Sequence, residues 1–148
     1  MKKHASATLF FLLLSACAED DNKISAQIKA QFEASPPAPI NLALVGPSSG
    51  ERVCFLGPYT MNEHAEKILG FKWDATGKTS IGGNDGINVL VFVQGNKVIA
   101  YAEHPRNKGD FSKSKPKCLT REQAVLDRQV DSSGWVYLVP RRQNTTSR

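Results

Sequence analysis

The chain has 148 residues, 41% of them hydrophobic, and a formal net charge of +5 at pH 7. This length and composition suit one globular domain with an ordinary core, and no segment beyond the first residues is apolar enough to span a membrane. The basic balance favours anionic neighbours, such as lipid phosphates, polymer carboxylates or an acidic protein, or else contributes only solubility.

A basic start followed by an apolar run over residues 9–14 is typical of an export signal. The run is too short to span the ~30 Å hydrocarbon core of a bilayer as a helix. It ends in Leu14-Ser15-Ala16-Cys17, which resembles the lipobox of bacterial lipoproteins. The resemblance implies that residues 1–16 are a signal peptide and that Cys17 is lipidated, with diacylglycerol on its sulfur and an acyl chain such as palmitate on its amine. An ordinary secretory signal with an incidental cysteine is the alternative.

The same resemblance implies a location for the mature protein. Ala18 after the lipidated cysteine suggests export to the outer membrane, facing the periplasm, with attachment through lipid alone. Residues 17–40 are then expected to be the lipidated cysteine and a flexible tether reaching up to about 75 Å, because the prolines of 35–39 favour an extended spacer. A short amphipathic helix inside the tether is the other interpretation of Ile24, Ile28 and Phe32, which recur every four residues.

The two remaining cysteines, Cys54 and Cys118, are expected to form a disulfide. An oxidising compartment and an even number of cysteines favour this pairing over free thiols or metal ligation. No Cys-x-x-Cys pair is present, so thioredoxin-like redox chemistry has no motif.

Residues 41–148 are expected to form a single domain whose first part alternates strands and turns. We predict short strands at 42–45, 52–56 and 71–73, and a helix from Thr60 to a glycine cap at Gly70. Residues 87–93 are apolar on both faces and predict a central strand, and Gly95-Asn96 predicts a hairpin turn into a strand at 97–103.

A second helix is predicted after residue 119, because Thr120 and Gln123 have capping-box spacing, and a last strand at 134–139. The element order indicates an α+β domain with a small, mostly antiparallel sheet and two helices packed on one face. Trp73 and Trp135 are expected to pack in the core.

A basic loop between residues 106 and 121 is the clearest candidate binding surface. Six cations fall in sixteen residues and only Asp110 opposes them, so the loop would attract phosphates or carboxylates, unless it is only a solvated segment. No recognition helix or aromatic platform accompanies the charge, so nucleic acid is not an expected partner. The six residues are Arg106, Lys108, Lys113, Lys115, Lys117 and Arg121.

The sequence offers no motif for a cofactor, a metal or a catalytic centre. Gly77-Lys78-Thr79 lacks the first glycine of a phosphate-binding loop, and residues 82–86 lack the closing glutamate of a calcium loop. His64 and His104 have no metal-ligand spacing and are expected to be exposed and structural. No Gly-x-Ser-x-Gly elbow occurs.

The sequence therefore predicts a lipid-anchored envelope protein that is not an enzyme. It would act as an adaptor, assembly factor or inhibitor, with the basic loop as its contact surface and an envelope protein or anionic envelope component as its partner. The first alternative is a carrier of lipid or polyanion, which requires a concave apolar pocket beside the basic loop. The second is a small hydrolase, which requires a histidine bonded to a serine hydroxyl and a carboxylate in a cleft.

Overall fold

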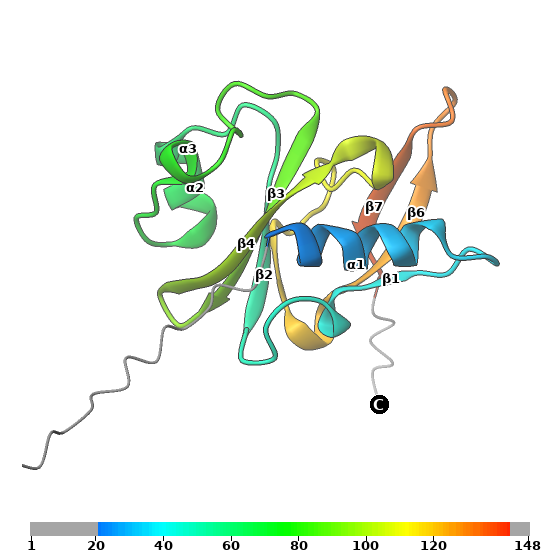
Figure 1. Cartoon of the computed structure of the whole chain (residues 1–148), viewed down its shortest axis with the longest axis horizontal. Coiled ribbons are helices and arrows are strands. Elements are labelled where there is room, and N and C mark those ends of the chain that lie inside the picture. The colour runs from blue at the N-terminus through cyan, green and yellow to red at the C-terminus, as the bar shows by residue number, and fades with distance from the viewer. Residues whose placement is uncertain (1–20, 143–148) are drawn as a thin grey trace, which may run out of the picture.

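The computed structural model describes residues 21–142, which contain three α-helices and two antiparallel sheets, so the expected α+β class is confirmed (Figure 1). The helices are α1 (Asp21–Glu33), α2 (Asn62–Leu69) and α3 (Ala75–Lys78). The strands are β1 (Ile40–Asn41), β2 (Arg52–Leu56), β3 (Ile87–Gln94), β4 (Lys97–Pro105), β5 (Cys118–Thr120), β6 (Val125–Val130) and β7 (Val136–Pro140). Short 3₁₀ helices are η1 (Leu42–Leu44), η2 (Arg106–Lys108) and η3 (Arg121–Gln123).

No helix within residues 21–142 is both long and apolar enough to cross a membrane. The expected signal peptide at 1–16 and the lipidation of Cys17 lie outside the described residues, and so does the C-terminal end of the predicted domain after residue 142.

The larger sheet has the order β4-β3-β2-β5 and is antiparallel throughout. The prediction for residues 87–93 is confirmed, since β3 lies inside this sheet and both of its faces are buried. Leu90 and Phe92 point into one hydrophobic cluster, and Val89, Val91 and Val93 point into another. Strand alternation therefore divides the core into two layers on opposite faces of one sheet.

Helices cover both faces of the larger sheet, so the expected placement of helices on one face is wrong. Figure 1 shows α2 and α3 on one side of β2 to β4, and α1 with the smaller sheet on the other. Ala65 and Leu69 of α2 belong to the cluster on the first side, while Ile24 and Ile28 of α1 belong to the cluster on the second.

A three-stranded sheet of order β1-β6-β7 replaces the predicted helix after Thr120, and that prediction is wrong. Thr120 makes no side-chain capping bond, and only one 3₁₀ turn, η3, follows it. β6 instead pairs with β1 on one side and β7 on the other, and the turn Asp131–Gly134 closes the β6–β7 hairpin. The pairing of β6 on both edges outweighs the local capping signal.

Residues 21–41 are part of the domain, so the expected flexible tether over 17–40 is wrong from Asp21 onward. The alternative amphipathic helix is the structure formed, because α1 buries Ile24 and Ile28 completely against the sheet. The proline-containing segment after Glu33 is an exposed connection, and it leads into β1.

Predictions for the shorter elements had mixed outcomes. The helix predicted to start at Thr60 is α2, and it begins at Asn62. The Thr60 hydroxyl donates to the carbonyl of Gly57 at 2.6 Å instead of capping the helix. Its glycine cap is confirmed, since Gly70 has φ +84° and donates its N–H to the Glu66 carbonyl. The strands expected at 42–45 and 71–73 do not form.

The disulfide between Cys54 and Cys118 is confirmed. The two residues are directly opposite each other on β2 and β5. The bond therefore joins the inner strand β2 to the three-residue edge strand β5, which directly follows the segment 106–117.

Candidate functional site

The cations of the basic loop do not form one free surface in the described structure. Arg106 donates from Nε and Nη2 to the carboxylate of Asp110 at 3.0 and 2.8 Å, and from Nη1 to the carbonyl of Asp85 at 2.7 Å. Its guanidinium also lies over the ring of Trp135, 5.6 Å from the centroid. Arg106 therefore holds three segments of the chain together.

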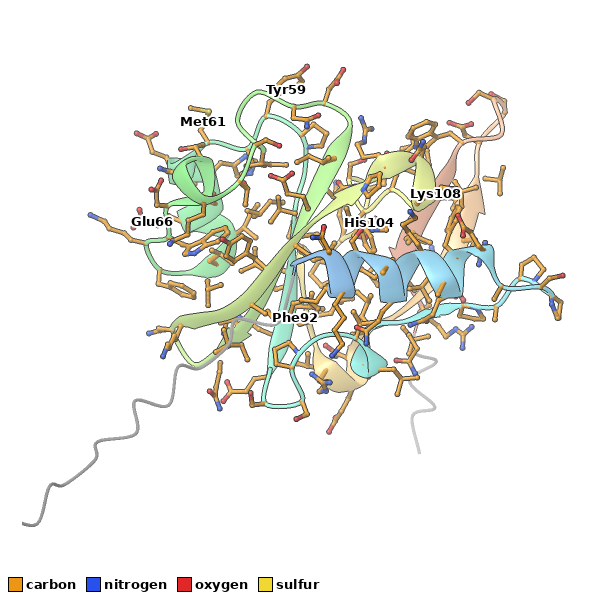
Figure 2. The ribbon with its side chains drawn as sticks, in the orientation of Figure 1. Tyr59, Met61, Glu66, Phe92, His104 and Lys108 are labelled. Atoms are coloured by element: carbon orange, nitrogen blue, oxygen red, sulfur yellow. A yellow bond between two sulfur atoms is a disulfide. The ribbon has the colours of Figure 1, made fainter. Side chains whose placement is uncertain are left out.

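Three further members of the set are also engaged inside the domain, Lys108 and Arg121 with distant segments and Lys117 within the loop itself. The ammonium of Lys108 pairs with Glu33 of α1 at 2.6 Å (Figure 2). Lys117 donates to the Ser112 carbonyl at 2.6 Å. Arg121 donates to the carbonyls of Pro47 and Ala43 at 2.8 and 2.7 Å, so it lies beside the 43–50 segment rather than with the other cations.

Lys113 and Lys115 are the exposed cations of the set. The Lys113 ammonium lies over the ring of Tyr137, 3.6 Å from its centroid. The role of the basic loop in binding stays a prediction, and these two lysines are the part of it that solvent reaches most freely.

Asp110 is a buried carboxylate at the centre of the loop. Besides Arg106, the indole N–H of Trp135 donates to it at 2.9 Å, the backbone N–H of Ser112 at 2.9 Å and the amide of Asn88 at 3.2 Å. Burial raises its pKa, but the hydrogen bonds from Arg106, Ser112 and Trp135 outweigh burial and lower the pKa to about 2. The cluster is fully paired at the carboxylate, which suits a structural role.

His104 is fully buried, so the expectation of an exposed histidine is wrong here, while His64 is exposed as expected. The ring of His104 lies between β4 and α1 (Figure 2), with Nδ1 3.0 Å from the hydroxyl of Ser25 and Nε2 2.9 Å from the carbonyl of Lys108. A carbonyl only accepts, so Nε2 carries the proton and Nδ1 accepts from Ser25. Burial lowers the pKa of His104, which keeps the ring neutral near pH 7.

The His104 contacts match only part of the catalytic arrangement that hydrolysis requires. A serine hydroxyl is in place, but the orienting partner is a backbone carbonyl rather than a carboxylate. The ring fastens α1 to the sheet instead of facing a cleft. Within the described residues no group of three histidine, cysteine or carboxylate side chains is arranged to hold a metal ion.

A shallow hollow with a cavity volume of about 10 Å³ lies beside Arg121. Its lining is mainly apolar and includes Leu42, Val53 and Phe92, with Arg52 and Arg121 at its polar side. Pockets that enclose drug-sized ligands begin at about 300 Å³. The hollow is therefore too small to take up a lipid.

The segment Gly57–Met61, here called the Tyr59 loop, carries two exposed apolar side chains and is the surface that sequence reasoning missed. Tyr59 is 58% exposed and Met61 is 57% exposed, and both project from the edge of the molecule in Figure 2. The other large exposed apolar side chains of the described residues, Leu44 and Val130, lie singly in sequence. Only the turn-forming Gly57-Pro58 before an aromatic residue hints at this loop in the sequence.

The backbone of Tyr59 has a conformation that bulky residues rarely adopt. Its φ of +60° makes it the one non-glycine residue with positive φ among the described residues. For L-residues this left-handed region costs roughly 1–2 kcal/mol. Such strain persists only where the surroundings hold it in place, and it gathers at functional sites.

Contacts on both sides hold the Tyr59 loop in this conformation. The N–H of Tyr59 donates to the carbonyl of Ile81 at 2.9 Å, and the buried Thr60 hydroxyl bonds back to Gly57. After the loop, the Asn62 amide joins α2 to α3 through bonds of 2.9 Å to the carboxylate of Asp74 and the N–H of Thr76. The loop therefore presents Tyr59 and Met61 on a fixed base.

No protein-family model, curated protein or solved structure matches this chain.

Proposed function

We propose that this chain is a lipid-anchored protein of the cell envelope that binds a partner protein without catalysing a reaction, and that the Tyr59 loop is its contact surface. The observation that carries the proposal is the exposed side chain of Tyr59 on a strained but well-held backbone. Strain kept at an exposed aromatic residue has no benefit for the isolated fold, so a benefit in binding explains it.

The chemistry of the loop suits protein recognition. Tyrosine is enriched among the few residues that dominate binding energy, and methionine adapts to irregular apolar surfaces. A loop already fixed in its bound shape loses little entropy on association, which leaves more of the contact energy for affinity. Adaptor, assembly and inhibitor roles all use such a surface.

The anchor and the location are part of the same proposal. Cys17 would carry the lipid, and Ala18 after it favours the outer membrane, with the domain facing the periplasm. The disulfide between Cys54 and Cys118 supports an oxidising compartment.

A second candidate is binding of an anionic envelope component through the exposed Lys113 and Lys115. Two lysines on the surface attract phosphate or carboxylate groups, but such contacts weaken with salt. The small hollow beside Arg121 and the carbonyl partner of His104 give less support to a lipid carrier or a hydrolase.

Photo-cross-linking in cells tests the partner and the surface together. A photoreactive phenylalanine analogue at position 59 of the full, lipidated chain should capture one envelope protein, whereas the same analogue at the exposed Val130 should not. Tyr59→Ala should weaken binding of that protein about 30-fold, because a tyrosine hot spot contributes about 2 kcal/mol.

The control for charge is the double variant Lys113→Glu, Lys115→Glu, which should leave the capture at position 59 intact. Equal capture at positions 59 and 130, or capture lost only in the lysine variant, would contradict the assignment of the Tyr59 loop. A Cys17→Ser chain tests the anchor, since it should no longer fractionate with membranes.

The strain at Tyr59 also predicts that a substitution which removes the side chain can stabilise the fold while it weakens binding. Tyr59→Gly should raise the free energy of unfolding by about 1 kcal/mol relative to Tyr59→Ala, because glycine adopts the left-handed region without a Cβ penalty. Urea denaturation of the two variants measures the difference. A glycine variant no more stable than the alanine variant would show that the backbone at this position carries no strain.

A further inference from the structure

The helix α1 is fixed to the domain along its whole length. Its first turns are held by the buried Ile24 and by the Ser25–His104 bond of 3.0 Å. Farther along, Gln31 exchanges two hydrogen bonds with the backbone of Asn41 at 2.7 and 3.1 Å, and Glu33 pairs with Lys108. The domain therefore includes α1 and does not begin only after the proline segment.

The connection from the proposed lipid anchor to this helix is very short. Cys17 and Asp21 are four peptide units apart, and a fully extended chain spans at most about 14 Å over that length. A tether through residue 40 would have reached about 75 Å. The start of α1 is thus confined to within about 14 Å of the position of Cys17, whatever path the connection takes.

We infer that the surface around the start of α1 lies against the phospholipid headgroups of the membrane in which Cys17 is anchored. The inference rests on the lipidation of Cys17 in the proposed function. Ala26 and the exposed side of α1 near it would face the lipid. The domain would sit directly on the membrane rather than at the end of an arm.

Charge does not provide this proximity. Glu19 and Asp20 lie between the anchor and the helix, and Asp21 begins the helix. These carboxylates oppose Lys23 and Lys29 of α1, so the segment nearest the anchor has no net attraction to anionic headgroups. The covalent connection alone holds the surface near the lipid. The contact should therefore be insensitive to salt, unlike an electrostatic one.

The arrangement leaves the Tyr59 loop away from the lipid-facing helix. The loop leads into α2, and α2 and α1 cover opposite faces of the larger sheet (Figure 1). A partner reached by the Tyr59 loop would consequently have to extend close to the same membrane, within about one domain diameter of the headgroups.

Quenching by spin-labelled headgroups tests the inference. The full, lipidated chain is placed in vesicles of phosphatidylethanolamine and phosphatidylglycerol with a fluorophore at Ala26→Cys on α1 or, as the matched control, at His64→Cys on α2; both side chains are exposed on helices. The probe at position 26 should be quenched about threefold more than the probe at 64, in low salt and in about 0.5 M salt.

A linker insertion provides the second arm. Twenty glycine and serine residues inserted between Asp20 and Asp21 give a mean reach of about 25 Å, so the quenching at position 26 should fall to that at 64. Equal quenching at the two positions of the original chain would overturn the inference. Quenching at position 26 that survives the insertion would also overturn it, since the surface would then bind lipid by itself.

The failure of the anchor is visible separately. Flotation of the chain with the vesicles reports lipidation, and a chain that does not float contradicts both the anchor and this inference. Cross-linking at position 59 tests the Tyr59 loop independently of either result.

Discussion

Replacing Cys54 and Cys118 together with alanine should lower the free energy of unfolding by about 4 kcal/mol. The disulfide closes a loop of 64 residues in sequence, so its removal restores much chain entropy to the unfolded state. A loss of this size is a large part of the stability of an ordinary domain. The double variant avoids a lone reactive thiol.

Urea denaturation of the double variant against the oxidised original chain measures this difference. The reduced original chain is the control, and it should fall to the midpoint of the variant. Proteolysis adds a local measurement, because the disulfide holds the three-residue strand β5 at the end of the segment 106–117, and that segment should be cut faster without it. An unchanged midpoint in the double variant would show that the bond contributes nothing to folding.

The two-faced pattern of β3 was predictable because side-chain alternation is a local property of a strand. Val89, Val91 and Val93 face one layer and Leu90 and Phe92 face the other, as the sequence pattern predicted. The disulfide was predictable by counting cysteines, given the expectation of an oxidising compartment. Neither inference required knowledge of distant contacts.

The segment after Thr120 was mispredicted because its structure depends on distant partners. Thr120 and Gln123 have the spacing of a helix start, yet β6 gains pairing with β1 from the other end of the described chain and with β7. The turn at Asp131–Gly134 was the local signal for the hairpin. Long-range pairing outweighed a short-range signal here.

The candidate site was the least predictable part, because exposure and hydrogen bonding depend on the assembled fold. A run of cations looked like a free binding surface, but backbone carbonyls and carboxylates inside the domain engage Arg106, Lys117 and Arg121. His104 was expected to be exposed because it ends a strand, but α1 packs over it and buries its ring. The exposure and positive φ of Tyr59 have no equivalent in the sequence pattern.

Replacing Asp110 with alanine should lower the free energy of unfolding by about 3–5 kcal/mol. The change leaves the guanidinium of Arg106 and the donors of Trp135, Asn88 and Ser112 without their shared buried acceptor. A buried donor or charge that has no partner is not compensated for the water it lost on folding. The cost in stability is therefore larger than that of one hydrogen bond.

The matched control for this substitution is Asp127→Ala. Asp127 also pairs with an arginine, Arg141 at 2.8 Å, but both side chains are about half exposed, so its loss should cost less than about 1 kcal/mol. Urea denaturation of both variants at neutral pH makes the comparison. Similar losses for the two variants would contradict the burial argument.

The pH dependence of stability tests the same cluster by a second route. Because the folded pKa of Asp110 is lowered from 3.8 to about 2, its ionised form stabilises the fold above about pH 4. This contribution, about 2 kcal/mol, should be lost as the pH falls from about 4 to 2.

Asp74 and Asp131 also have lowered pKa values and act in the same direction. The original chain is therefore compared with Asp110→Asn, in which position 110 no longer titrates while the other carboxylates still do. The asparagine variant should be less stable at neutral pH and lose less stability on acidification. Parallel pH profiles for the two chains would show that Asp110 is not held ionised by Arg106 and Trp135, and that the cluster at the centre of the basic loop is weaker than its geometry indicates.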